Sequence, residues 1–293
     1  MPEPSRGTLF VVGGAEDKER GKLILRRFRD AAGADNARIL VVATASSMPE
    51  ALLANYESAF NELGVADLRL TYQEQRADAQ DPDLIESLRQ ATGVYFTGGD
   101  QLKLVTTLGG TGFASALHDC YRSGLHIGGT SAGASAMSTV MIARGRGRSA
   151  PRLASVRLSP GLGILRRVIV DQHFQERDRI GRLMAAVLRN PYMLGFGIDE
   201  DTAFIVSPEG RVEVLGKGTL TIVDGADLIG SSIAEVKEHQ PIAFAGIKVH
   251  VLATGWEFDL GSRTISVPHP HRRQDAPASK LVATTTLSEG DKG

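Results

Sequence analysis

Runs of apolar residues alternate with amphipathic stretches over the first 190 residues of the chain. Continuous apolar or β-branched runs at residues 8–14, 38–45 and 125–129 are typical of strands that are buried on both faces. Helical patterns separate such runs, for example at residues 52–63, where four apolar residues form one stripe that Gly64 ends. This alternation predicts an α/β fold with a mainly parallel, doubly wound sheet that helices cover on both faces.

The pattern changes after Asn190. Short β-type runs (LGFGID, TAFIVS, RVEVLG and TLTIVD) follow one another, separated by turn residues and with little helix between them. They predict an antiparallel C-terminal extension of the same sheet. No linker interrupts the pattern, so we expect a single domain over residues 1–270. Residues 271–293 are polar, aperiodic and free of aromatic residues, which predicts a disordered tail.

Composition narrows the classes of partner. The 33 lysines and arginines nearly balance the 34 aspartates and glutamates, so no overall field favours nucleic acid or an anionic membrane. The single cysteine, Cys120, excludes intramolecular disulfides and paired-cysteine metal sites. The histidines of PHPH (268–271) have no further ligands beside them, so no metal and no cofactor is expected. No signal peptide or membrane span is evident, which predicts a cytoplasmic protein.

The stretch GTSAG (129–133) follows an apolar run and precedes a helix of small residues. It fits G-x-S-x-G, a sharp strand-to-helix turn that exposes the serine hydroxyl of a hydrolase. Ser131 is therefore the candidate nucleophile, and the backbone N–H of Ala132 is a candidate oxyanion donor at the helix start. A phosphate-binding loop or a dinucleotide fingerprint would need other spacings. A tight turn without a catalytic role is the alternative.

Two later stretches supply partners for a serine. His173 ends the apolar run VIVDQH, and Asp199, Glu200 and Asp201 end the run LGFGI. Residues at the carboxyl ends of neighbouring strands meet at one rim of the sheet, as a nucleophile, a base and an orienting acid require. The order serine, histidine, acid differs from that of the α/β-hydrolases. Alternatively, the histidine caps a helix and the acids face water.

Five motifs together resemble the dipeptidase E-like serine peptidases, and among them those that degrade cyanophycin. They are VVGGAEDK, FTGGDQLKL, GTSAGA, VDQHFQERDRIGRL and GIDEDTA, and the resemblance runs from about residue 8 to about residue 265. It implies a fold like that of class I glutamine amidotransferases, with serine in place of cysteine. It also implies exopeptidase hydrolysis of cyanophycin, a polyaspartate with β-linked arginines, to β-Asp-Arg dipeptides. A homodimer without a cofactor is expected from the same resemblance.

The resemblance also implies roles for individual residues. Ser131 is expected to be the nucleophile, His173 the general base and acid, and Glu200 the orienting carboxylate, with oxyanion N–H groups from Ala132 and from Gly99 or Asp100. Residues that match the substrate pocket are Gln101, Asp171, Gln172, Arg177, Arg179 and Arg182. The basic segment RGRGRSAPRLASVR (144–157) departs from the family pattern, which leaves its contacts with substrate open.

The residues after His173 suit such a polymer, because each repeat carries a free carboxylate and a guanidinium. Arginines and acids interleave there, and arginine binds a carboxylate through paired hydrogen bonds. At helical spacing Arg179 and Arg182 share a face, whereas Arg177 is expected to precede the helix. A solvated helix face is the structural alternative. The functional alternatives are an aspartyl dipeptidase that removes amino-terminal aspartate and a non-catalytic binding protein on the same scaffold.

Overall fold

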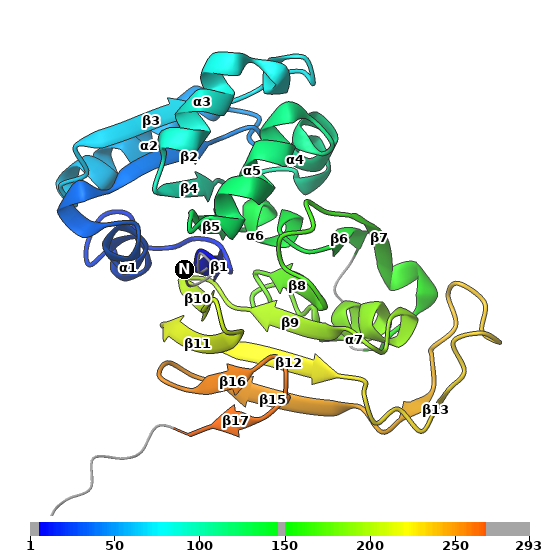
Figure 1. The fold of residues 1–293 in the computed structure, drawn as a ribbon. Helices are drawn as coiled ribbons and strands as arrows, with labels where there is room; N and C mark the ends of the chain where they lie inside the picture. The colour runs from blue at the N-terminus through cyan, green and yellow to red at the C-terminus, as the bar shows by residue number, and fades with distance from the viewer. Residues whose placement is uncertain (1–5, 146–149, 268–293) are drawn as a thin grey trace, which may run out of the picture.

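The computed structural model describes residues 6–145 and 150–267 of the chain. A nine-stranded sheet runs through the molecule in the order β17-β16-β11-β10-β1-β5-β4-β2-β3 (Figure 1). Its last five strands are parallel to one another: β1 (Leu9–Val12), β5 (His126–Thr130), β4 (Gly93–Phe96), β2 (Arg38–Val42) and β3 (Asp67–Thr71). The predicted α/β class with a mainly parallel central sheet is therefore confirmed.

Helices cover both faces of this parallel part. The helices are α1 (Leu23–Ala31), α2 (Pro49–Glu62), α3 (Pro82–Gln90), α4 (Gln101–Leu108), α5 (Gly112–Arg122) and α6 (Ala132–Ala136). In β1, Phe10 packs into the apolar cluster of α1 and α2, whereas Leu9 and Val11 pack into the cluster of α3 to α6. Successive side chains of a strand point to opposite faces, so both faces of the sheet are buried and the sheet is doubly wound.

The C-terminal strands divide between two sheets, so the predicted extension of one sheet is wrong in part. The strands that extend the main sheet antiparallel are β10 (Thr202–Val206), β11 (Arg211–Gly216), β16 (Glu257–Asp259) and β17 (Ile265–Ser266). A second sheet has the order β15-β12-β9-β8: β15 (Lys248–Leu252), β12 (Leu220–Asp224), β9 (Leu194–Ile198) and β8 (Val168–Gln172). Because β9 and β10 are both buried throughout, their apolar runs do not reveal which sheet each joins.

Smaller elements complete the fold. Two hairpins form the pairs β6 (Val140–Gly145) with β7 (Val156–Pro160), and β13 (Gly230–Ser231) with β14 (Phe244–Ala245). Helix α7 (Ile180–Arg189) packs its apolar face against β8 and the β6–β7 hairpin. Single 3-10 turns are η1 (Ala34–Asn36), η2 (Asp78–Gln80) and η3 (Leu153–Ser155).

Several expectations concern surface and terminal features. Cys120 is half-buried on α5, and burial raises the pKa of its thiol. No helix in the described ranges has the length and apolar character needed to span a bilayer. The predicted tail at 271–293 and the PHPH histidines lie outside the described residues.

Candidate active site

Ser131 occupies the turn between the end of β5 and the start of α6. Its backbone has φ 52° and ψ −108°, a left-handed conformation that is costly for a non-glycine residue. The flanking glycines are needed because a Cβ on Gly129 would lie 2.8 Å from the backbone carbonyl carbon of Gly133, and one on Gly133 would clash with the carbonyl oxygen of Phe96. The bend predicted from the motif is present, and it projects the Ser131 hydroxyl from the sheet edge.

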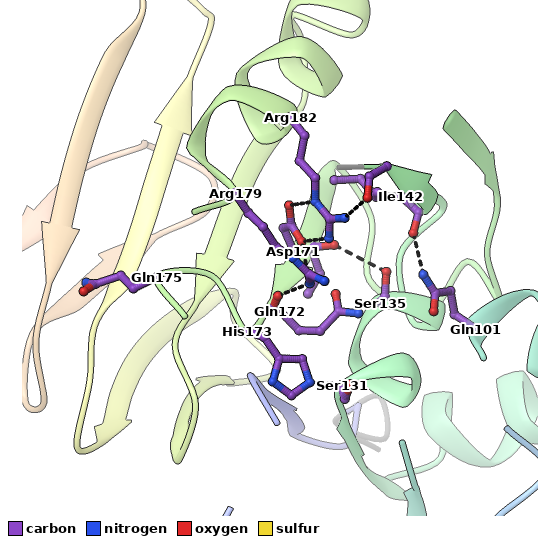
Figure 2. Close-up of polar contacts among 12 residues, drawn as sticks. Gln101, Ser131, Ser135, Ile142, Asp171, Gln172, His173, Gln175, Arg179 and Arg182 are labelled. Atoms are coloured by element: carbon purple, nitrogen blue, oxygen red, sulfur yellow. Dashed lines mark hydrogen bonds and ion pairs between the residues drawn. The ribbon is translucent and has the colours of Figure 1, made fainter. Parts of the chain in front are cut away.

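His173 follows β8 directly and faces Ser131, as Figure 2 shows. Its Nε2 lies 2.8 Å from Ser131 Oγ, and its Nδ1 lies 2.5 Å from Glu200 Oε1. The backbone N–H of His173 donates to the backbone carbonyl of Gly13. The imidazole of His173 fills the space where a side chain on Gly14 would be. The glycine pair after β1 therefore makes room for the histidine, a function that its sequence motif alone did not reveal.

Only one member of the acidic cluster contacts the imidazole. Asp199 is buried and accepts hydrogen bonds from the N–H and hydroxyl of Thr219, at 2.8 and 2.7 Å. Asp201 forms an ion pair with Lys217 at 2.6 Å. Glu200 is thus the carboxylate that reaches His173, whereas its two neighbours stabilise the surrounding loops.

The two expected oxyanion donors on the loop after β4 differ in their hydrogen bonding. The Asp100 N–H donates to the carbonyl of Ala45 at 2.8 Å, and the Asp100 carboxylate caps the start of α4. Gly99 has φ 142°, and its N–H has no hydrogen-bond partner among the described residues. The neighbouring Gly98 packs beside Ser131, since a Cβ there would lie 3.4 Å from Ser131 Cβ. Gly99 is therefore the better candidate of the two.

A pocket of about 460 Å³ opens beside Ser131. Its lining residues are Gly99, Gln101, Ser131, Ala143, Arg144, Gly145, Gln172, Arg177, Arg179 and Arg182. Four of these carry guanidinium groups, so the pocket is strongly cationic. Most of the expected substrate residues meet here, and Arg144 joins them from the basic segment for which the sequence left substrate contacts open.

The arginines of the pocket differ in how they are bound. Asp171 is fully buried at the end of β8 and accepts from Arg182 Nε at 2.7 Å and from Arg182 Nη2. Arg179 lies 3.3 Å from the same carboxylate and also donates to the Gln172 carbonyl. Burial lowers the pKa of Arg179 to about 10, an effect that Asp171 opposes. Arg177 is exposed and precedes α7, as expected.

Two glutamines contribute amide groups to the pocket. Gln101 Nε2 donates to the backbone carbonyls of Ile142 and Ala143, at 2.9 and 3.0 Å. Gln172 is almost fully buried, and its Oε1 has no hydrogen-bond partner within the described residues. This oxygen is itself shielded from solvent, so it is an unpaired polar atom inside the pocket wall rather than a group on the pocket surface.

A buried carboxylate that the sequence analysis did not single out lies next to the elbow. Glu16 Oε2 accepts from the Thr130 hydroxyl at 2.6 Å, and Oε1 accepts from the Tyr56 and Tyr95 hydroxyls. Lys18 supplies the countercharge at 3.1 Å. Burial, together with this carboxylate, raises the pKa values of both tyrosines. The only sequence signal was an acid placed just after a buried strand.

No group of three or more metal-ligating side chains occurs in residues 6–145 and 150–267. A serine on a strand-to-helix elbow, hydrogen-bonded to a histidine that a carboxylate contacts, characterises a serine-type hydrolase.

Comparison with known proteins narrows this class. The chain belongs to peptidase family S51, whose sequence model matches residues 9–214, and it is a serine-type peptidase. It is 40% identical over 256 residues to a cyanophycinase of Geminocystis herdmanii, covering 87% of this chain and 94% of that protein. It is 38% identical over 272 residues to a cyanophycinase of Trichormus variabilis, covering 92% and 91%. The family resemblance seen in the sequence motifs is confirmed.

A solved structure shares the fold. The crystal structure of a peptidase from an acI-B1 Actinobacterium superposes with a TM-score of 0.65 at 22% sequence identity. The match covers 88% of this chain and 98% of that one. The overall fold is therefore one that another peptidase also adopts.

Proposed function

We propose that this peptidase hydrolyses cyanophycin as an exopeptidase and releases β-Asp-Arg dipeptides. The observation that carries the proposal is the hydrogen-bonded series Ser131–His173–Glu200 at the edge of a cationic pocket. The two relatives named cyanophycinase, each matched over about nine-tenths of its length, support the choice of substrate.

In the proposed mechanism, Ser131 Oγ attacks the carbonyl carbon of the scissile bond. His173 Nε2 lies 2.8 Å away and accepts the hydroxyl proton as the new C–O bond forms. Glu200 accepts a hydrogen bond from Nδ1, which holds the imidazole in the required tautomer and stabilises its cationic form. The Ser-His-Glu triad thereby produces a nucleophile at neutral pH.

Negative charge that develops on the carbonyl oxygen needs donors in the same place. We assign the N–H groups of Ala132, at the start of α6, and of Gly99 to this role. His173 then protonates the leaving amine, and an acyl-enzyme remains on Ser131. A water molecule, deprotonated by His173, attacks this ester and releases the product acid with the free serine.

Recognition of the branched polymer is assigned to the pocket. The exposed Arg177 is a donor for the carboxylates of the substrate. Arg179, Arg182 and Asp171 form the buried wall behind it. A cationic wall suits a repeat that carries a free carboxylate.

Incubation of the purified protein with insoluble cyanophycin tests the proposal. We expect β-Asp-Arg as the product by mass spectrometry, and a loss of about 10⁴-fold or more in rate for Ser131→Ala, which keeps the fold. Faster cleavage of short peptides with amino-terminal α-aspartate than of cyanophycin would instead indicate an aspartyl dipeptidase. Absence of labelling by a fluorophosphonate would favour a non-catalytic binding protein.

The family resemblance leads us to propose also a homodimer located in the cytoplasm. Light scattering during size-exclusion chromatography measures the mass of the assembly. A value near the 31.3 kDa of one chain would contradict the dimer.

A further inference from the structure

Arg144 is an exposed guanidinium at the wall of the catalytic pocket, on the strand β6. Within residues 6–145 and 150–267, no side chain forms a hydrogen bond or an ion pair with it. Its partner across the β6–β7 ladder is Arg157, so two like charges lie directly opposite each other. Such a pair destabilises a hairpin, and an anion bound beside Arg144 offsets this repulsion.

The backbone on both sides of Arg144 is held by hydrogen bonds. The β6–β7 register shifts between Ile142 and Arg144, which marks a β-bulge of the kind that re-aims a side chain. Gln101 Nε2 donates to the carbonyls of Ile142 and Ala143 on one side of Arg144. Arg182 Nη1 donates to the carbonyl of Gly145 on the other side, at 2.9 Å. Figure 2 shows Gln101 and Arg182 on either side of this strand.

We propose that Arg144 is a specificity-determining residue that binds a carboxylate of the substrate, and that Gln101 and Arg182 are positioning residues which hold it in place. The inference rests on the proposed function, in which each arginine branch of cyanophycin carries a free α-carboxylate. Arg182 is less suited to that carboxylate, because it is buried and three of its five N–H groups are already used: Nε and Nη2 donate to Asp171, and Nη1 donates to the carbonyl of Gly145. Among the described residues no side chain occupies the guanidinium fork of Arg144, which can therefore form paired hydrogen bonds with a carboxylate.

Two alanine variants show whether Arg144 acts through a specific contact with the substrate or only through its positive charge near the pocket. Arg144→Ala removes the proposed contact, and Arg157→Ala removes the same charge from the opposite strand of the hairpin, outside the pocket lining. With soluble oligomers of β-Asp-Arg as substrate, we expect kcat/KM to fall about ten- to thirtyfold for Arg144→Ala, mainly through KM. We expect a change within about twofold for Arg157→Ala. Equal losses in the two variants would overturn the assignment.

A pair of ligands tests directly whether Arg144 binds the α-carboxylate of the arginine branch. The dipeptide β-Asp-Arg and its arginine amide differ in whether the arginine α-carboxylate is present, and each can protect Ser131 from a fluorophosphonate. In the wild type we expect the free acid to protect at about tenfold lower concentration than the amide, and Arg144→Ala to remove that preference. A preference that persists in Arg144→Ala would show that another group binds the carboxylate.

A failure of the Arg144 assignment and a failure of the proposed function give different results in these experiments. If the wild type does not cleave cyanophycin, the proposed function fails, yet the protection assay still decides the role of Arg144 because it needs no turnover. If the wild type cleaves cyanophycin and Arg144→Ala has an unchanged KM, only the assignment of Arg144 fails.

A double-mutant cycle tests the positioning role. If Gln101 acts through Arg144, Gln101→Ala raises KM without changing the rate of Ser131 labelling, and it has little further effect in the Arg144→Ala background. Additive losses in the double variant would mean that Gln101 contacts the substrate itself, which contradicts the positioning role.

Discussion

The family resemblance implies that Arg182 binds the substrate, whereas its contacts in the structure indicate that it stabilises the fold. Replacing Arg182 by methionine distinguishes the two roles. Asp171 has no exposed surface, and Arg182 supplies it with two hydrogen bonds. Arg182→Met removes both and leaves the buried carboxylate with only Arg179, at 3.3 Å. Removing one partner of a buried ion pair costs about 3–5 kcal/mol.

For a chain of this size, about 2 °C in Tm corresponds to 1 kcal/mol, so we expect Tm to fall by about 6–10 °C in thermal unfolding followed by circular dichroism. Arg177→Met is the matched control, because Arg177 is exposed and its loss should change stability by less than about 0.5 kcal/mol. In the double variant Asp171→Asn/Arg182→Met the loss should be smaller than the sum of the single losses, since no uncompensated carboxylate remains.

An unchanged Tm in Arg182→Met, with activity nonetheless lost, would refute this reasoning. Arg182 would then act on the substrate rather than on Asp171. Additive losses in the double variant would likewise contradict a direct energetic link between the two residues.

Three further predictions concern the nucleophile and its surroundings. Glu200→Gln should reduce kcat by up to about 10⁴-fold because it disfavours the productive tautomer of His173, whereas Asp201→Asn should change kcat little. A larger loss of kcat for Asp201→Asn than for Glu200→Gln in steady-state kinetics would contradict the assignment of Glu200 as the orienting acid. Gly133→Ala should cost about 1–3 kcal/mol or more and lower fluorophosphonate labelling, because the new methyl group clashes with a carbonyl oxygen of β4. Thr130→Val should lower the free energy of unfolding in urea by about 1.5–3 kcal/mol, since it removes a 2.6 Å hydrogen bond to a buried carboxylate; an unchanged urea midpoint would contradict that value.

The elbow and the parallel sheet were predictable from sequence because their causes are local. Strands buried on both faces need continuous apolar runs, and β2 and β4 show such runs. The bend at Ser131 needs small neighbours within two residues on either side, and Gly129 and Gly133 lie at those positions. Neither feature depends on what the rest of the chain does.

The division of the C-terminal strands between two sheets was not predictable in this way. The strands β9 and β10 are separated by only three residues, and both are fully buried. They nevertheless pair with different partners, β9 with β8 and β12, and β10 with β1 and β11. An apolar run records that a strand is buried, but it does not record which distant strand lies beside it.

The same limit applies to the candidate site. The sequence by itself determined that a serine, a histidine and a cluster of acids each follow a strand, and that arginines follow the histidine. The family resemblance implied Glu200 as the orienting acid, whereas the residues alone left three acids open, and the structure shows that Glu200 contacts His173. Only the tertiary structure decided that Arg182 is bound to the buried Asp171 and that Arg144 lies in the pocket. Hydrogen bonds and ion pairs act over a few ångströms between residues far apart in the chain, so their partners are chosen by strand pairing and burial.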